Sequence, residues 1–349
     1  MKRLINPFTI TILVVTIILL LPTILPNKEI EEISDDRLRD IALSTGMLPT
    51  PKTYDKLLKI VDNPQNRMTP QKISLGKRLF NEKIISRDRD ISCASCHLLD
   101  QGGDDNLPTA IGYRKRVNPS HLNSPTVLNS ALAKSEFWDG RAKDVEEQAG
   151  GPIQAKFEMN MTPKEVVSRL NLIPNYITAF QEVFNEPISF ANVRKAIGAY
   201  ERTLLTYGDY DRFLDGNSSA ISAKAKRGMT IFMTKGCKGC HSGISLGGQS
   251  IQKFPLRRYF SDYIGLKESP FPFINEGGFL GRDDKLKFRV PILRNIAKTS
   301  PYFHNGAVKE LKEAVRIMSK YQLGNEFNPK EIDEVVAFLE TLSGDLVEY

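Results

Sequence analysis

All four cysteines of this 349-residue chain lie in two short motifs of the form Cys-x-x-Cys-His. The motifs are Cys93-Ala-Ser-Cys96-His97 and Cys237-Lys-Gly-Cys240-His241. The spacing suits covalent attachment of haem, because two cysteine thioethers must reach two vinyl positions of one porphyrin. The adjacent histidine then turns under the ring and binds the iron as its fifth ligand. The sequence therefore predicts two c-type haems, each attached to its own segment of the chain.

Other uses of paired cysteines explain the two motifs less well. A zinc site needs two cysteine pairs that converge on one metal ion, and zinc does not account for a histidine after both pairs. A thioredoxin-like dithiol belongs to a βαβ unit, whereas this chain has a helical pattern. Disulfides are a further use in exported proteins, and four cysteines allow three pairings. We therefore favour haem over zinc, a redox dithiol and disulfides.

A degenerate two-fold repeat predicts two similar domains. Gly76 to Phe80 and Gly228 to Phe232 have the same spacing, and each pair precedes a haem motif. Helical signals dominate elsewhere, and long strands with a period of two are hard to find. We therefore expect a mostly α-helical protein with two haem domains and long loops.

The helix and linker signals divide the chain into four parts. These are an apolar leader over 1–27, a linker with short helices over 28–65, an N-terminal haem domain over 66–212 and a C-terminal haem domain over 213–349. Thr69 and Pro70 mark a helix start, because a capping hydroxyl precedes a proline at the first helical position. The stretch 211–219 is expected to link the haem domains. Further helices are expected over 162–170, 190–205, 310–322 and 329–342.

The N-terminus sets the expected compartment. Lys2 and Arg3 precede an uncharged stretch that ends at Lys28, and residues 4–27 reach the length of about 20 apolar residues that spans a bilayer. This order of charges fits an export signal. A cleavable signal ends in small residues, and no alanine precedes Ala42, so we favour an uncleaved anchor. We therefore predict a periplasmic or extracytoplasmic protein that is tethered to the cytoplasmic membrane.

The overall charge argues against one class of partner. The chain has 48 Lys and Arg against 41 Asp and Glu, a formal net charge of +7, and no block of Lys or Arg stands out. Nucleic-acid binding is therefore not supported. The modest positive excess would suit docking of an acidic partner protein.

The sixth ligand of each iron decides what the haem does, because a methionine opposite the histidine gives a closed haem of high potential. For the second haem the candidate is Met318, which shares a helix face with Leu311 and Val315. Periodicity alone favours a core methionine at this position. Met229 and Met233 are rivals on the helix before the motif.

For the first haem the spare histidines are His121 and His304. Each more often has a surface or supporting role than that of an iron ligand. From the residues alone we leave this iron open, with a face that can bind peroxide.

Longer motifs resemble the bacterial dihaem cytochrome c peroxidases, from about Asp35 to the end of the chain. They are Ser92-Cys-Ala-Ser-Cys-His97, Asn123-Ser-Pro-Thr-Val-Leu-Asn129, Phe137-Trp-Asp-Gly-Arg141, Glu147-Gln-Ala-Gly-Gly-Pro-Ile153, Glu158-Met159, Gly236-Cys-Lys-Gly-Cys-His241, Pro301-Tyr-Phe-His304, and Ile317-Met318 before Gln322-Leu323-Gly324. The resemblance implies two cytochrome c-like domains, with a peroxidatic haem in the N-terminal domain and an electron-receiving haem in the C-terminal domain. It also implies that the protein reduces hydrogen peroxide with electrons from a small redox protein, which would be a cytochrome c or a copper protein. Members of the family tend to form homodimers, so the resemblance implies a homodimer as well.

The resemblance assigns catalytic roles. Met318 becomes the sixth ligand of the electron-receiving haem, which replaces the core interpretation. Glu158 matches the family's acid/base carboxylate beside the peroxide site, Gln148 its neighbouring amide, and Trp138 the residue that carries electrons between the haems. A carboxylate can move a proton between the two peroxide oxygens, and an amide can stabilise the charge that develops. Taken alone, Glu158 would be a solvated carboxylate, Gln148 a surface amide and Trp138 a core aromatic.

The resemblance also implies a calcium site at the domain junction. Asn123, Thr299 and Pro301 match this site, the last two through their backbone carbonyls. Calcium takes several oxygen ligands, so water would have to complete the set. Taken alone, Asn123 would be a turn residue before Ser124 and Pro125.

One loop departs from the family pattern. The family's switchable distal histidine follows a Leu-Pro-Thr-x-Ile-Gly stretch, and here residues 107–112 are followed by Tyr113. Two residues are also inserted before Asn123, and the insertion contains His121. Tyr113 would bind the iron through its phenolate, His121 would replace the lost ligand, or the site would stay open and need no reductive activation. We favour the open site, because the three basic residues 114–116 favour a solvated loop.

Two other functions are the alternatives. The first is a related dihaem oxidase, which would act on a protein or organic substrate. Relatives of that type have tyrosine in place of the methionine ligand of the electron-receiving haem. The presence of Met318 therefore argues against the oxidase. A non-catalytic dihaem electron-transfer cytochrome would have two six-coordinate low-spin haems and no peroxide turnover.

Overall fold

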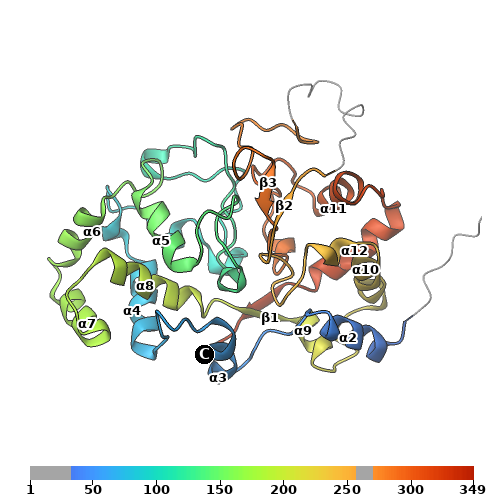
Figure 1. Cartoon of the computed structure of the whole chain (residues 1–349), viewed down its shortest axis with the longest axis horizontal. Coiled ribbons are helices and arrows are strands. Elements are labelled where there is room, and N and C mark those ends of the chain that lie inside the picture. Colours follow the sequence, from blue (N-terminus) through green and yellow to red (C-terminus); the bar gives the residue numbers. More distant parts are fainter. Residues whose placement is uncertain (1–32, 257–269) are drawn as a thin grey trace, which may run out of the picture. The chain divides into compact units, whose positions relative to one another are not determined.

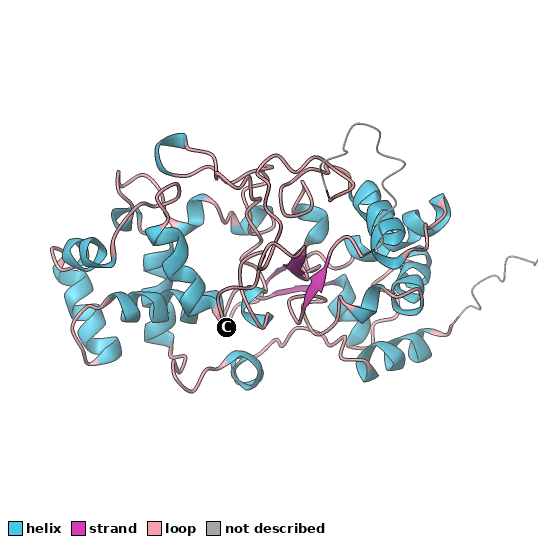
Figure 2. Ribbon diagram, turned by 45° about the horizontal axis from the view of Figure 1, so that its top comes forward, coloured by secondary structure: helices cyan, strands magenta, loops and turns pink. Residues whose placement is uncertain are grey.

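Helices make up most of the regular structure in the computed structural model, which describes residues 33–256 and 270–349 (Figures 1 and 2). This confirms the expected mostly α-helical class. The expected apolar helix over residues 4–27 lies outside the described residues. Within the described ranges, no helix has the length and apolar character that crossing a bilayer requires.

The helices gather in two groups, and the early helix α2 (Asp35–Ser44) lies with the later helices α9 (Asp209–Leu214) and α10 (Ala223–Thr234) (Figure 1). One group contains α4 (Pro70–Phe80), α5 (Val145–Gln154), α6 (Pro163–Leu170), α7 (Pro174–Phe184) and α8 (Phe190–Glu201). The other contains α2, α9, α10, α11 (Leu311–Ile317), the π-helical turn Met318–Leu323 and α12 (Pro329–Glu340). Helix α3 (Tyr54–Val61) lies in the segment that joins α2 to α4.

The strands are short, as the sequence predicts. Strand β1 (Thr206–Gly208) pairs antiparallel with β4 (Gly344–Leu346), and β2 (Ile251–Lys253) pairs antiparallel with β3 (Lys287–Arg289). Long irregular segments connect these elements and fill the region between the two helix groups (Figure 2). These segments supply much of the lining of the cavities described below.

Local capping explains where the predicted helices begin. The Thr69 hydroxyl accepts a hydrogen bond from the N–H of Lys72, and Pro70 occupies the first helical position of α4. Thr162 and Glu165 form a capping box at the start of α6. Each cap satisfies N–H groups that have no partner within the helix. The predicted helix starts near residues 70 and 162 are therefore confirmed.

The predicted helix ends are less accurate. The helix expected over 190–205 ends at Glu201, and the helix expected over 329–342 ends at Glu340. The helix expected over 310–322 changes to π-helical geometry at Met318. Helix α9 spans the expected boundary between residues 212 and 213, so the expected linker begins as helix and only then turns.

A close helix crossing occurs in both halves and accounts for the repeated glycine. A Cβ atom at Gly76 in α4 would collide with the backbone carbonyl of Ala196 in α8, and one at Gly228 in α10 would collide with the carbonyl of Glu334 in α12. Only glycine allows the two backbones to approach this closely. The repeat in the sequence therefore corresponds to two similar helix pairs.

A buried ion pair connects segments that are far apart in the chain. The guanidinium of Arg294 donates two hydrogen bonds of 2.8 Å to the carboxylate of Asp211 in α9. The same carboxylate accepts from the backbone N–H of Thr50 at 2.8 Å. Both charged side chains are at most 1% exposed, so each depends on the other for its charge balance.

Candidate functional site

Each Cys-x-x-Cys-His motif forms a short 3-10 turn in the wall of its own cavity. The backbone N–H of His97 donates to the Cys93 carbonyl at 3.0 Å, and that of His241 donates to the Cys237 carbonyl at 2.9 Å. The four cysteines form no disulfide. The two cysteine pairs line separate cavities. The described residues also contain no cluster of three or more His, Cys, Asp or Glu that could hold a metal ion. A zinc site shared by the two pairs is therefore excluded.

Both histidines have one ring nitrogen occupied and one left for a metal. His97 Nδ1 lies 3.0 Å from the carbonyl oxygen of Gly103, and His241 Nδ1 lies 3.2 Å from that of Leu246. This hydrogen bond favours the tautomer with the proton on Nδ1, so Nε2 would be the atom available to a metal. Burial lowers the pKa of both histidines, that of His241 to about 4, so both are neutral.

The surroundings of the two histidines also repeat. The ring of Phe80 lies 6.4 Å from that of His97, and the ring of Phe232 lies 6.4 Å from that of His241, measured between centroids. Phe80 is the last residue of α4, and Phe232 lies two residues before Thr234, the last residue of α10. The residues present therefore fit a c-type haem in both cavities, with thiols for the thioether bonds and a neutral imidazole for the iron.

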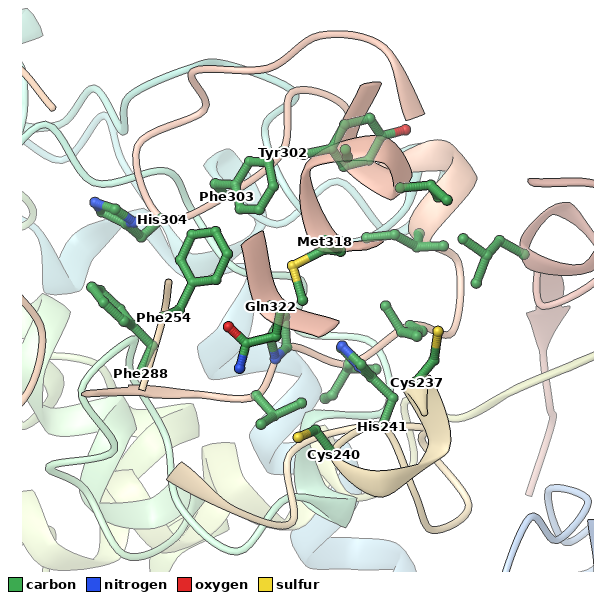
Figure 3. A pocket seen from close by; sticks show the side chains of 18 of the residues that line it. Cys237, Cys240, His241, Phe254, Phe288, Tyr302, Phe303, His304, Met318 and Gln322 are labelled. Atoms are coloured by element: carbon green, nitrogen blue, oxygen red, sulfur yellow. The ribbon is translucent and has the colours of Figure 1, made fainter. Parts of the chain in front are cut away.

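Met318 lies across the cavity from His241. Figure 3 shows its thioether and the His241 imidazole pointing into the cavity from opposite sides. Leu311 and Val315 line the same cavity, as the helix period predicts. The rival candidates Met229 and Met233 are buried in α10 and are not among the residues that line this cavity.

The His97 cavity holds the predicted proton-transfer residues. Glu158 and Gln148 both line it, together with Arg141. Burial raises the pKa of Glu158 to about 7, and the positive charge of Arg141 opposes this rise. A carboxyl group with this pKa can both accept and return a proton near neutral pH.

Neither of the two alternative ligands suggested by the sequence lines the His97 cavity. Tyr113 is 8% exposed, its N–H donates to the Glu158 carbonyl at 2.8 Å, and its ring lies under the guanidinium of Arg114. His121 Nδ1 lies 3.4 Å from a carboxylate oxygen of Glu276. Met159 lines the cavity but packs in the buried hydrophobic cluster of the N-terminal half.

Trp138 lies in a wall that the two cavities share. It lines both of them, as do the residues from Asn123 to Thr126. Its indole Nε1–H donates to the carbonyl oxygen of Asn123 at 2.8 Å, and its ring lies 6.4 Å from that of His304 in an edge-on arrangement. His304 is buried among phenylalanine rings and contacts Asn275 through Nε2 at 3.0 Å.

The three residues expected at a calcium site lie in the lining of one cavity. Asn123, Thr299 and Pro301 all line the His241 cavity, and so does Asp104. Asp104 is 1% exposed, its Oδ1 makes no hydrogen bond to the part of the chain that the structure describes, and burial raises its pKa to about 7. A buried carboxylate oxygen in the same cavity lining as these residues is a suitable donor for a hard cation.

Three buried charged residues near the cavities were not predicted. Glu136 and Glu201 line the His97 cavity, and Arg289 lines the His241 cavity; each is at most 5% exposed. Burial raises the pKa of Glu136 to about 7 and that of Glu201 well above its usual value. No local sequence signal distinguishes these residues from ordinary surface charges.

Comparison with known proteins identifies the family. Residues 70–219 match the family described as di-haem cytochrome c peroxidase, and residues 225–343 match cytochrome c. A cytochrome c551 peroxidase of Pseudomonas aeruginosa is 43% identical over 288 residues, which cover 79% of this chain and 80% of the relative. The chain belongs to the di-haem cytochrome c peroxidase family.

Further relatives agree with this assignment. A cytochrome c551 peroxidase of Nitrosomonas europaea is 39% identical to this di-haem peroxidase over 292 residues, 82% of the chain and 85% of the relative. The crystal structure of a MauG-like protein associated with microbial copper homeostasis has a TM-score of 0.69 at 25% identity and covers 86% of this chain and 95% of that one. The di-haem peroxidase is therefore an oxidoreductase that acts on peroxide, and its family supports c-type haem as the cofactor.

Proposed function

We propose that the chain reduces hydrogen peroxide to water in the His97 cavity, with electrons that a small redox protein delivers to the His241 cavity. The observation that carries this proposal is the difference between the two cavities. Opposite His241 lies a thioether, whereas the His97 cavity offers the proton-transfer pair Glu158 and Gln148. The proposed division into haem domains over 66–212 and 213–349 assigns one function to each.

The chain's own residues would hold haem and handle the protons. Cys93, Cys96 and His97 would hold one haem, and Cys237, Cys240, His241 and Met318 the other. Haem c would supply an iron that exchanges single electrons and, at an open face, accepts a peroxide oxygen. The Glu158 carboxylate takes the proton of one peroxide oxygen and returns it to the other, which leaves as water. The Gln148 amide donates a hydrogen bond to the oxygen on which charge develops.

Trp138 is proposed as the path between the cavities. Its indole lines both, and the hydrogen bond from Nε1 to the Asn123 carbonyl fixes the orientation of the ring. Peroxide needs two electrons and two protons to give two molecules of water. The electrons therefore have to cross this wall singly, and an aromatic ring is the side chain suited to that position.

We also propose that calcium binds beside Trp138. Asn123, the carbonyls of Thr299 and Pro301, and the unused carboxylate oxygen of Asp104 are the candidate ligands. A divalent cation would lower the free energy of the buried carboxylate, which otherwise lacks a partner for Oδ1. Because Asn123 also accepts the Trp138 hydrogen bond, calcium at this position would hold the indole in place.

We also propose a cellular compartment, an electron donor and an oligomeric state for this protein. The charges at Lys2 and Arg3 and the apolar stretch 4–27 support export and a membrane tether. The donor would be a small cytochrome c or copper protein, and a homodimer is proposed from the family resemblance. Membrane fractionation of the full-length chain and size-exclusion chromatography test the tether and the dimer.

Rapid mixing of the reduced protein with peroxide tests the mechanism. The wild-type protein should be reoxidised much faster than a Glu158→Gln variant, because glutamine keeps the shape of the side chain and cannot accept the proton. Equal rates for the two proteins would contradict the proposed role of Glu158.

A further inference from the structure

Arg289 is a buried cation, and within residues 33–256 and 270–349 no acidic side chain lies within hydrogen-bond distance of it. It is 4% exposed, and its Nη1 makes no hydrogen bond to this described part of the chain. A carboxylate oxygen of Glu136, Oε2, lies 3.8 Å from Nη1, which is too long for a hydrogen bond. Burial raises the pKa of Glu136 to about 7, so this carboxyl is an incomplete counter-charge.

The backbone around Arg289 fixes the side chain beside Trp138. Arg289 ends strand β3, its N–H donates to the Trp138 carbonyl at 2.8 Å, and its Nε donates to the Phe137 carbonyl at 3.2 Å. The first bond holds the backbone and the second holds the guanidinium through Nε, while Nη1 has no hydrogen-bond partner among the described residues. Unpaired buried guanidinium groups are costly, so this arrangement indicates a missing anion.

The position of Arg289 in the cavity indicates which anion is missing. Arg289 lines the His241 cavity, and its neighbour Phe288 lies across that cavity from Cys237 (Figure 3). A haem held by thioether bonds has its two propionates on the opposite edge of the porphyrin. The propionates of a haem attached at Cys237 and Cys240 would therefore be held by residues on the side of the cavity that β3 lines, which include Arg289.

We propose that Arg289 binds a propionate of the haem at His241, and that this contact raises the reduction potential of that haem. Planar guanidinium and carboxylate groups form paired, charge-assisted hydrogen bonds. The propionate charge favours the ferric state of the nearby iron, and the cation offsets this charge. Arg289 is thus a positioning residue that acts on the iron through the propionate, and it holds the Trp138 backbone at the same time.

This inference rests on the proposed haem attachment at Cys237 and Cys240, and it is independent of peroxide chemistry at His97. The test is potentiometric titration of the two-haem protein, followed by absorption, for the wild type, Arg289→Gln, Arg289→Lys and Lys253→Gln. Lys253 lines the same cavity but is exposed, so it is the matched control for loss of a positive charge. The haem content of every variant is counted by the pyridine haemochrome assay.

Arg289→Gln should shift the reduction equilibrium of the His241 haem toward the ferric form by roughly tenfold, which is about 59 mV for one electron. Arg289→Lys should retain much of the wild-type potential, and Lys253→Gln should leave it unchanged. The His97 haem should keep its potential in all variants. An unchanged potential in Arg289→Gln, or an equal shift in Lys253→Gln, would overturn the proposal.

A second measurement tests the proposal if the Arg289→Gln variant does not fold or does not bind haem. Resonance Raman spectra report the bending mode of each haem propionate, which depends on its hydrogen bonds. The frequency of this mode should differ between the wild type and Arg289→Lys. A lysine ammonium group cannot form the two parallel hydrogen bonds that a planar guanidinium group makes to a carboxylate. Identical propionate modes would overturn the proposal, whereas loss of haem from the wild type would instead contradict the proposed attachment.

Discussion

The backbone N–H of Tyr113 donates a hydrogen bond of 2.8 Å to the carbonyl oxygen of Glu158. The position at which family relatives have a switchable histidine is thereby held against the segment that carries the proposed catalytic carboxylate. Tyr113 is not among the residues that line the His97 cavity, and its ring lies instead beside the guanidinium of Arg114. This geometry supports the open-site alternative over ligation by Tyr113 or His121.

The first prediction concerns activation. The fully oxidised protein should turn over peroxide without a lag and without prior reduction of one haem. Tyr113→Phe should leave the absorption spectrum unchanged and alter kcat/KM for peroxide by less than about twofold, because the phenol contacts no reacting group. The progress curves of oxidised and pre-reduced samples provide the measurement. A lag that pre-reduction abolishes, or a spectral change in Tyr113→Phe, would show that a ligand has to leave.

The second prediction is a pH dependence set by Glu158. Burial raises the pKa of this carboxyl to about 7, and only the deprotonated form can accept the peroxide proton. The kcat/KM for peroxide should therefore be constant above pH 7 and fall as the pH drops through 7. Glu158→Gln should lower kcat/KM by roughly 10²–10⁴-fold and remove this limb. Glu182→Gln, an exposed residue of α7, is the control and should retain both rate and profile.

The third prediction tests the axial position of Met318. Met318→His should lower the potential of the His241 haem and slow its reduction by the donor, because a thioether opposite histidine raises the potential. Met233→Leu alters a methionine that is buried in α10 outside the cavity lining, so it should leave the potential unchanged. Potentiometry with absorption detection compares the two variants. Equal potentials in Met318→His and the wild type would rule out Met318 as the ligand.

The fourth prediction concerns stability. Asp211→Asn leaves the fully buried Arg294 without its counter-charge, so the free energy of unfolding should fall by about 3–5 kcal/mol. Asp209→Asn, two residues earlier in α9, breaks an exposed pair with Arg212 and should change stability by at most about 1 kcal/mol. Urea unfolding of the haem-loaded proteins measures both. Equal decreases in the free energy of unfolding for the two variants would contradict the stabilising role of the buried pair between Asp211 and Arg294.

Local features of the fold could be predicted from the sequence because their causes lie within a few residues. The Thr69 cap and Pro70 predict the start of α4, and the spacing of Leu311, Val315 and Met318 predicts their common face. Helix ends were predicted less well: the buried Leu204 and Leu205 extend the apolar pattern beyond Glu201, where α8 ends, although they lie in the segment that leads to β1. The helix-to-π transition at Met318 likewise has no simple signal in the sequence.

The tertiary part of the site could not be predicted from the residues alone. Glu136 and Arg289 come from distant segments, and only the fold brings their side chains to within 3.8 Å. The roles proposed for Glu158 and Trp138 came from the family resemblance, since taken alone each has an ordinary structural interpretation. The sequence shows that Tyr113 stands where the family has its distal histidine. Whether Tyr113 can reach the His97 cavity depends on the fold of its loop, which the sequence does not give.

The most direct test of two unlike haems is an EPR and absorption spectrum of the purified protein, taken fully oxidised and again after addition of one electron per molecule. The protein should contain one low-spin haem that is reduced first and one high-spin haem that stays ferric after that electron. Two low-spin six-coordinate haems in both states, or a colourless protein without covalently bound haem, would contradict this prediction.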